Sequence, residues 1–156
     1  MSHSRQAPGP ISQRVELLRL AREPLGLARM ESGWATLNEQ QPGALAGCCV
    51  LLPDPVVGSV NQLADAARTA FLADLIRLGD AVLAATAAER INYLILCNQV
   101  EELHAHVVPR FSTEDPALRR LGPFEAYDFA SARAADPSGA DAALGERLRR
   151  ALAAPR

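Results

Sequence analysis

Two strand-like segments, INYLILCN (91–98) and ELHAHVVPR (102–110), follow each other with little more than residues 99–101 between them. A connection this short predicts antiparallel neighbours, because parallel strands need a long crossover. The sheet that contains these segments is therefore expected to be antiparallel.

The elements before this pair are shorter. Apolar residues recur at helical spacing within residues 11–22, and Pro24 ends that predicted helix. Two strand-like runs flank Glu31-Ser32-Gly33, which predicts a hairpin because the glycine can supply a positive φ. The run GCCVLLP (47–53) is typical of a buried strand that ends at Pro53.

Two further helices are predicted from apolar spacing. The longer one begins near Ser59, where Ser59 and Gln62 have the spacing of a capping box, and it continues to about Ala87. Its apolar stripe consists of Leu63, Ala67, Ala70, Phe71, Leu75, Leu78 and Val82. A last helix is expected from about Ser138, with Ser138 and Asp141 as a second box and one face formed by Leu144, Leu148 and Leu152.

The order of these elements predicts an α+β fold, in which an antiparallel β-sheet carries one long helix and short helices stand near both ends. The 156 residues are enough for one domain with a buried core. We expect residues 1–10 to be disordered, 11–130 to form the domain, and 131–156 to form a C-terminal extension with a helix.

The composition is that of an ordinary globular protein. Apolar residues make up 49% of the chain, and the net charge of −2 lacks the basic excess of a non-specific nucleic-acid binder. No apolar run approaches the roughly 20 residues that span a bilayer, and residues 1–10 lack the apolar region of a secretory signal. We expect a cytoplasmic protein that binds neither nucleic acid nor membrane. The absence of lysine excludes P-loop lysine and Schiff-base chemistry.

Cys48, Cys49 and Cys97 form an odd set, and two of them are adjacent in an apolar strand. Reduced, buried thiols are the expected state of all three.

Two of the three histidines lie two residues apart in the last strand-like segment. Because side chains alternate along a strand, Glu102, His104 and His106 are expected on one face. The opposite face would carry the apolar residues Leu103, Ala105 and Val107. This pattern is typical of a strand with one polar working face.

Several interpretations of this face are open. The simplest is that the two histidines are exposed to solvent and have no function. A metal site needs three or four ligands, but Pro109 and Arg110 occupy the positions where a third, carboxylate ligand would be expected. We therefore expect no metal. In nucleophilic catalysis, one imidazole attacks phosphorus while a second binds the phosphoryl oxygens.

The segment ELHAHVVPR resembles the signature of the histidine triad family, in which histidines alternate with apolar residues and Pro-Arg often follows. WATLNEQQPGALAGCCVLLP (34–53) resembles the family's paired nucleoside-binding strands, and RINYLILCNQV (90–100) resembles the strand before the signature. The three blocks, in order over about residues 25–111, are similar to the short prokaryotic branch of diadenosine tetraphosphate hydrolase-like proteins.

The resemblance implies a role for each matching residue. His104 occupies the position of the nucleophile, and His106 occupies the position that binds phosphate. Asn98 matches the amide that contacts the α-phosphate, Gln99 is expected to add a polar contact, and Asn38 matches the residue that hydrogen-bonds the ribose. The family also implies a homodimer without a cofactor, apart from magnesium with a polyphosphate substrate.

The implied activity is that of a nucleotide hydrolase or nucleotidyl transferase. His104 would attack the α-phosphorus of a dinucleoside polyphosphate, a nucleoside phosphoramidate or an adenylylated small molecule, and water would release the nucleotide. The alternative is a catalytically weak nucleotide-binding dimer that serves as a sensor or scaffold.

Two residues depart from the family pattern. Glu102 stands where the first histidine of the triad is expected, and Cys48 stands where many members have a histidine after the glycine. A charged carboxylate on the face of His104 would repel an anionic substrate and favour the protonated imidazole over the neutral nucleophile. Removal of that charge is therefore expected to raise turnover.

Other polar and aromatic residues have simpler interpretations. Trp34 is interpreted as a core or rim residue, with base stacking as the alternative. Arg110 is expected either in a surface ion pair or on a phosphate. Phe124, Tyr127 and Phe129 are interpreted as packing for the C-terminal segment, with the active-site rim of the partner subunit as the alternative.

Overall fold

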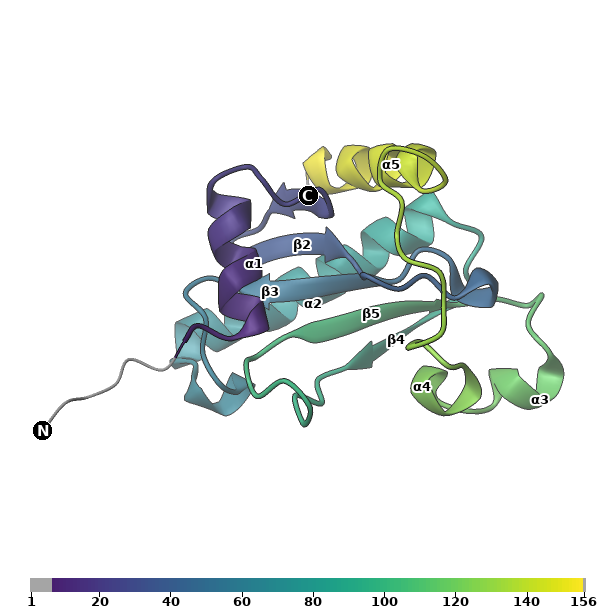
Figure 1. Ribbon diagram of the computed structural model, residues 1–156, viewed down its shortest axis with the longest axis horizontal. Helices are drawn as coiled ribbons and strands as arrows, with labels where there is room; N and C mark the ends of the chain where they lie inside the picture. The colour runs from purple at the N-terminus through teal and green to yellow at the C-terminus, as the bar shows by residue number, and fades with distance from the viewer. Residues whose placement is uncertain (1–6, 156) are drawn as a thin grey trace, which may run out of the picture.

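The computed structural model describes residues 7–155, which form one five-stranded antiparallel sheet with helices on both faces (Figure 1). The strands are β1 (Gly26–Arg29), β2 (Gly33–Leu37), β3 (Cys49–Pro53), β4 (Arg90–Leu94) and β5 (Ala105–Arg110), in the order β1-β2-β3-β5-β4. The predicted α+β class, the hairpin between β1 and β2, and the antiparallel pairing of β4 with β5 are confirmed. Disorder was predicted for residues 1–10, of which 1–6 lie outside the described residues, whereas Gly9 is the N-cap of α1 and Pro10 is its first residue.

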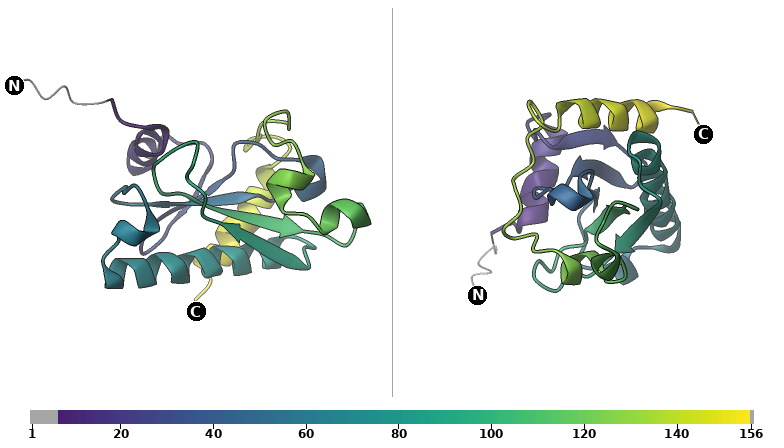
Figure 2. Two further views of the ribbon diagram at one scale, coloured as in Figure 1. Left: turned by 90° about the horizontal axis from the view of Figure 1, so that it is seen from below. Right: turned by 90° about the vertical axis from the view of Figure 1, so that its right-hand side faces the viewer.

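The helices cover the two faces of the sheet unequally. They are α1 (Pro10–Arg19), α2 (Asp65–Ala85), α3 (Pro116–Arg119), α4 (Pro123–Ala126) and α5 (Ala142–Ala153), with short 3-10 turns at Gly43–Leu45 and Val60–Gln62. The long helix α2 runs across one face, and α5 lies beside it at the β1 end, whereas α1 lies on the other side (Figure 2). Within the described residues, no helix is long and apolar enough to cross a membrane.

The main core lies between α2 and the sheet. Because β3 is the central strand, every residue from Cys49 to Pro53 is buried, as the apolar run predicted. The three leucines predicted on one face of the last helix are also buried, and they contribute to this core together with Phe71 and Leu78 of α2. Burial of the apolar stripes of α2 and α5 against the sheet is the dominant stabilising contribution in this fold.

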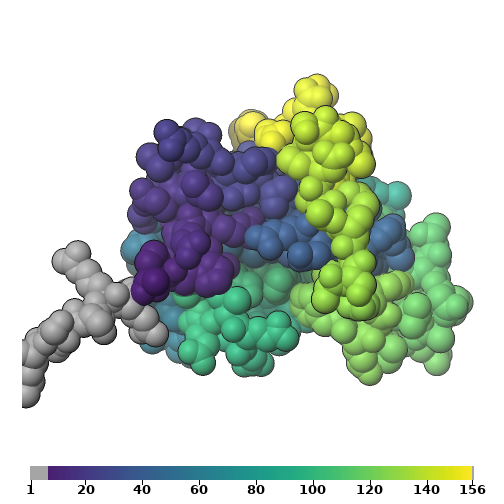
Figure 3. Space-filling view, in the orientation of Figure 1, coloured from purple at the N-terminus to yellow at the C-terminus, as the bar shows by residue number. Residues whose placement is uncertain are grey.

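The opposite face, called the front face below, is covered in two places. Ile11, Val15 and Leu18 of α1 pack on Val50 and Leu52 of β3. At the other end of the strands, Leu45, Cys48 and Val108 are covered by the C-terminal segment that carries Tyr127 and Phe129. Figure 3 shows strand residues in blue in the gap between α1 and this yellow-green segment.

Both predicted capping boxes are wrong. The Gln62 side chain accepts a hydrogen bond from the Gly58 N–H at 2.8 Å, and Ser59 caps only a 3-10 turn without a side-chain bond. The backbone is extended at Ala64, so α2 begins at Asp65. The α5 helix begins at Ala142, because the Asp141 carboxylate pairs with Arg133 instead of capping the helix.

The connection between β4 and β5 spans residues 95–104, which is longer than the predicted 99–101. The Leu103 N–H donates to the Val57 carbonyl at 2.8 Å, so the backbone leaves the sheet before residue 105. Cys97 has a φ of +54°, which turns the chain within this loop. The loop therefore carries residues that the sequence pattern placed in strands.

Candidate active site

His104 lies in this loop, immediately before β5, and is half-buried. Its Nδ1 is 2.7 Å from the backbone carbonyl oxygen of Glu102. A carbonyl oxygen can only accept, so Nδ1 carries the proton when the ring is neutral. The lone pair of the neutral ring is then on Nε2, which is the tautomer that a nucleophile requires.

His106 lies beside His104 on the front face. The two ring centroids are 5.1 Å apart and the rings meet edge to face at 81°. Burial, with a smaller contribution from the neighbouring His104, lowers the pKa of His106 to about 4. His106 is therefore neutral at pH 7 and can donate one N–H to a ligand. Its Nδ1 is buried and has no hydrogen-bond partner among residues 7–155.

The aromatic cluster near the C-terminus covers His106. Phe124 of α4 lies 5.0 Å from His106 between ring centroids, and Phe129 lies 4.6 Å from Phe124. The sequence predicted packing of the C-terminal segment or a place at the active-site rim of a partner subunit, whereas Phe124 contacts His106 of its own chain. The sequence carries no signal for this contact, because Phe124 and His106 lie in separate elements that only tertiary packing brings together.

Glu102 and His104 both precede β5, which begins at Ala105, so the strand alternation that predicted a shared face does not apply to them. Its carboxylate accepts from the N–H of Ile11 at 3.0 Å and of Ser12 at 3.2 Å, and from the Ser12 hydroxyl. These donors form the N-terminus of α1, where unpaired N–H groups and the helix dipole attract a carboxylate. Gly9, the N-cap residue, has no side chain to accept them, and a Cβ on Gly9 would lie 2.0 Å from Glu102 Oε1. Glu102 therefore caps α1 through a long-range contact.

The three cysteines are free, but they differ in environment. Burial raises the pKa of Cys48 to about 12 and also raises that of Cys49, so both are unreactive core thiols, as predicted. Cys97 is only half-buried, contrary to the prediction, because the loop holds it at the surface. Its Sγ lies 3.8 Å from His104 Nδ1 and donates to the His104 carbonyl at 3.5 Å.

Asn38 follows the end of β2 and is 7% exposed. Its side-chain amide donates to the Gln40 carbonyl at 2.8 Å. The buried Gln41 side chain donates to the Asn38 and Cys48 carbonyls and accepts from the Gly47 N–H, which fixes this end of the β2–β3 connection. The amide predicted to contact ribose is therefore held in place by its own loop.

Asn98 and Gln99 are exposed in the loop 95–104, four residues or more beyond the end of β4. They precede His104 in the same loop but do not occupy the strand end where the pattern placed them. Trp34 packs against the α1 cluster and donates from Nε1 to Asp54 at 3.0 Å, which agrees with a rim residue.

Arg14 of α1 was not identified from the sequence. Its Nη2 donates to Thr36 Oγ1 at 3.2 Å, its Nη1 lies 3.9 Å from Glu39 Oε1, and its buried Nε has no partner among the described residues. Thr36, Val50 and His106 occupy neighbouring register positions on β2, β3 and β5, so they share the front face. A guanidinium with unused donors thus stands above the strand row that carries His106. Arg14 lies in no motif, so no sequence signal marks it.

No group of three or more histidine, cysteine, aspartate or glutamate side chains within residues 7–155 is placed to hold a metal ion.

Comparison with known proteins identifies the fold. No family model matches the sequence, and no curated protein matches it. A solved histidine triad protein from Bradyrhizobium japonicum matches with a TM-score of 0.67, at 16% identity over 86% of this chain and 94% of that one. The chain has the histidine triad fold. A histidine triad (HIT) protein from Sinorhizobium meliloti matches with a TM-score of 0.66, at 20% identity over 85% of this chain and 93% of that one.

A third histidine triad structure, from Sulfolobus tokodaii, is described as a hypothetical nucleotide-binding protein. It matches with a TM-score of 0.68, at 12% identity over 90% of this chain and 91% of that one. At such identities the likeness concerns the arrangement of strands and helices. It supports the predicted histidine triad architecture and leaves the branch of the family open.

Proposed function

We propose that this protein is a nucleotide hydrolase or nucleotidyl transferase that cleaves an α-phosphorus bond through a nucleotidyl intermediate on His104. The observation that carries the proposal is the hydrogen bond from His104 Nδ1 to the Glu102 carbonyl, beside His106 in a histidine triad fold. The bond fixes the tautomer in which Nε2 is the nucleophile.

The reaction would proceed in two displacements at phosphorus. Nε2 of His104 forms a bond to the α-phosphorus, and the bond to the leaving group breaks with its electron pair. The substituted ring is cationic and still donates from Nδ1 to Glu102, which makes it a good leaving group. Water then attacks phosphorus and loses a proton to solvent, the N–P bond breaks with its electron pair on Nε2, and release of the nucleotide restores neutral His104. In a transferase, another hydroxyl takes the place of water.

His106 and Arg14 would stabilise the phosphate. His106 is neutral, so it offers one N–H to a phosphoryl oxygen without a full charge. Arg14 adds a cation with unused donors near the same face. Asn38 remains the proposed ribose contact, and Asn98 and Gln99 remain proposed phosphate contacts from the loop before His104.

The proposed substrates are dinucleoside polyphosphates, as in the diadenosine tetraphosphate hydrolase-like branch, nucleoside phosphoramidates and adenylylated small molecules. Magnesium would be needed only to neutralise a polyphosphate. We place the protein in the cytoplasm, where such nucleotides occur.

We also propose a homodimer. The β4 strand is the edge of the sheet, so its outer backbone groups are free to pair. Beside it, Leu72, Ile76 and Leu83 of α2 and Tyr93 of β4 are 43%, 51%, 38% and 37% exposed, respectively. A second copy that pairs along β4 would cover these apolar side chains.

Replacement of the nucleophile tests the activity. In His104→Ala, turnover of a nucleoside phosphoramidate should fall by about a thousandfold or more, while AMP binding and thermal stability persist. Glu101→Ala, an exposed change in the same loop, is the control. Mass spectrometry without acid quenching should detect the adduct on His104, and EDTA should leave turnover unchanged. Turnover within a few-fold of the parent would remove His104 from the role of nucleophile.

The engagement of Glu102 with α1 favours one alternative, a nucleotide-binding dimer with weak catalysis. With Glu102 occupied, the first position of the triad offers no side chain beside the two imidazoles. Tight AMP binding without turnover on a phosphoramidate panel would support this sensor or scaffold function.

A further inference from the structure

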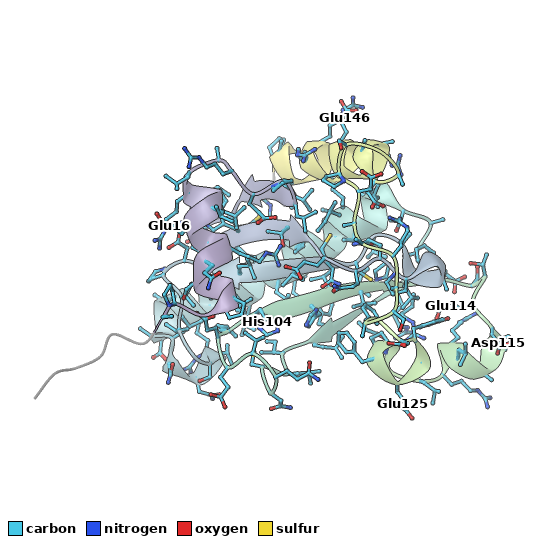
Figure 4. All side chains as sticks on the ribbon, viewed as in Figure 1. Glu16, His104, Glu114, Asp115, Glu125 and Glu146 are labelled. Atoms are coloured by element: carbon cyan, nitrogen blue, oxygen red, sulfur yellow. The ribbon has the colours of Figure 1, made fainter. Side chains whose placement is uncertain are left out.

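A polar cavity lies at the end of β5 that is remote from the histidines. Its volume is about 610 Å³, and its polar lining consists of Glu89, Arg90, Asn92, Arg110, Arg119 and Arg120. Figure 4 labels Glu114 near this end of β5 and His104 near the opposite end. Asn92 pairs with Val108, two rows beyond the pair formed by Leu94 and His106, and Tyr127 packs in the cluster that covers Val108. Neither His104 nor His106 lines the cavity. The cavity is therefore separate from the candidate active site.

One of the lining arginines is a structural part of the cavity. Arg110, with a side chain 6% exposed, donates to both carboxylate oxygens of the buried Glu114 and to Asn92 Oδ1 at 2.9 Å. It also donates to the Leu118 carbonyl at 3.1 Å and the Leu121 carbonyl at 2.6 Å. These bonds hold the end of α3 on the sheet. Because Arg119 and Arg120 lie between Leu118 and Leu121, the bonds also fix the backbone of these two arginines.

The remaining lining charges are not balanced. Arg119 lies 3.4 Å from Glu89, and Arg110 is neutralised by Glu114. Neither Arg90 nor Arg120 forms an ion pair with any of the residues 7–155.

Four guanidinium groups against two carboxylates leave an excess of two positive charges around the cavity. Asn92 adds a donor, because its Oδ1 accepts from Arg110 and its amide nitrogen is left for a ligand.

We propose that this cavity is a second ligand site that binds a phosphate-bearing anion with more than one phosphate group. Arginine is the side chain best suited to phosphate, because its planar fork matches two oxygens of the group. Two exposed, uncompensated arginines and a donor amide provide the charge and the donors, and the bonds of Arg110 fix the wall beside them. The site requires neither His104 nor His106, so it does not depend on the proposed reaction.

Binding of inorganic pyrophosphate tests the proposal. Calorimetric titration of the full chain at low ionic strength should show saturable binding that weakens as salt screens the arginines. Arg90→Gln and Arg120→Gln should each weaken this binding by about tenfold, since each removes a charge-assisted contact. Arg22→Gln is the matched control, because Arg22 is exposed and lies in another part of the chain.

A variant that combines His104→Ala with His106→Ala separates this site from the candidate active site. Its affinity for pyrophosphate should equal that of the parent. The proposal is overturned if the parent shows no saturable binding, if Arg90→Gln and Arg120→Gln bind as tightly as Arg22→Gln does, or if binding disappears in the double histidine variant.

Discussion

Glu102 and His104 are separated by one residue, yet their side chains have different partners. The backbone carbonyl of Glu102 binds the imidazole, whereas its carboxylate binds the first N–H groups of α1. A residue at the position of the missing histidine thus orients the candidate nucleophile through its main chain and anchors the N-terminal helix through its side chain. The structure thus gives the carboxylate a role in capping α1 that the sequence did not predict.

Loss of this cap should destabilise the protein. Glu102→Ala leaves helix N–H groups without an acceptor, so the free energy of unfolding should fall by about 1–2 kcal/mol. Urea denaturation measures the change. Glu101→Ala removes an exposed neighbouring carboxylate and should stay within about 0.5 kcal/mol of the parent. Higher turnover in Glu102→Gln, with unchanged stability, would restore the idea that the carboxylate acts on His104.

His106 makes stability depend on pH. Its pKa is about 4 in the folded protein, compared with 6.5 for an ordinary histidine. Between these values the unfolded chain binds a proton that the folded protein does not, so stability falls as pH decreases from 6.5 towards 4. The loss should approach about 3 kcal/mol and should be absent in His106→Gln. Urea denaturation of both proteins at pH 7.5 and 4.5 gives the difference; equal pH dependence would contradict the lowered pKa.

At the scale of elements, the short helices α3 and α4 depend on a buried polar network. Burial alone would raise the pKa of Glu114, but hydrogen bonds from Arg110, Phe111 and Tyr127 hold it below its usual value. The same network attaches residues 121–127 to the end of β5, and this segment includes Phe124, which contacts His106. From the sequence, Arg110 was expected either in a surface ion pair or on a phosphate. It forms an ion pair with Glu114, but the pair is buried.

Removal of one partner of this pair should be costly. Arg110→Ala leaves the buried Glu114 charge uncompensated, and the free energy of unfolding should fall by about 3–5 kcal/mol. Arg150→Ala, which breaks the exposed pair with Glu146, should cost less than about 1 kcal/mol. Thermal and urea unfolding compare the two variants. A double variant with Glu114→Ala should recover part of the loss, and full additivity would mean that the two side chains do not interact.

At the scale of the whole molecule, exposed apolar side chains lie on one face of α2 beside the edge strand β4. They are Leu72, Ile76 and Leu83, with the exposed Asp80 between Ile76 and Leu83 on the same helix face. This surface is the structural basis of the proposed homodimer.

A charge placed on this surface should separate the two copies. Light scattering after size exclusion should give twice 16.7 kDa for the parent and 16.7 kDa for Ile76→Asp, because a buried charge without a partner opposes association. Leu20→Asp is the control, since Leu20 is 53% exposed and Ile76 is 51% exposed. A monomeric parent, or a dimer in both variants, would exclude this surface as the interface.

The sequence by itself determined the features that depend on neighbours in the chain. The alternation of apolar residues, the apolar stripe of α2 and the two strand-like runs that flank residues 31–33 predicted the antiparallel α+β fold, and the spacing of His104 and His106 located the candidate site. Gly33 does not supply the predicted positive φ, since it is the first residue of β2. These patterns are local, because side-chain direction in a strand or helix repeats every few residues.

Only the tertiary structure decided where the polar groups of the site are satisfied. Glu102 finds its donors 91 residues away in Ile11, His106 is covered by Phe124, and Arg14 reaches Thr36 from another element. Hydrogen bonds and ring contacts form between groups that tertiary packing brings close together. The periodicity of apolar residues in the sequence does not predict which groups these are. A carboxylate expected to act on the nucleophile therefore caps a helix that is distant in sequence, because the unpaired N–H groups at the start of that helix lie within hydrogen-bond distance of it.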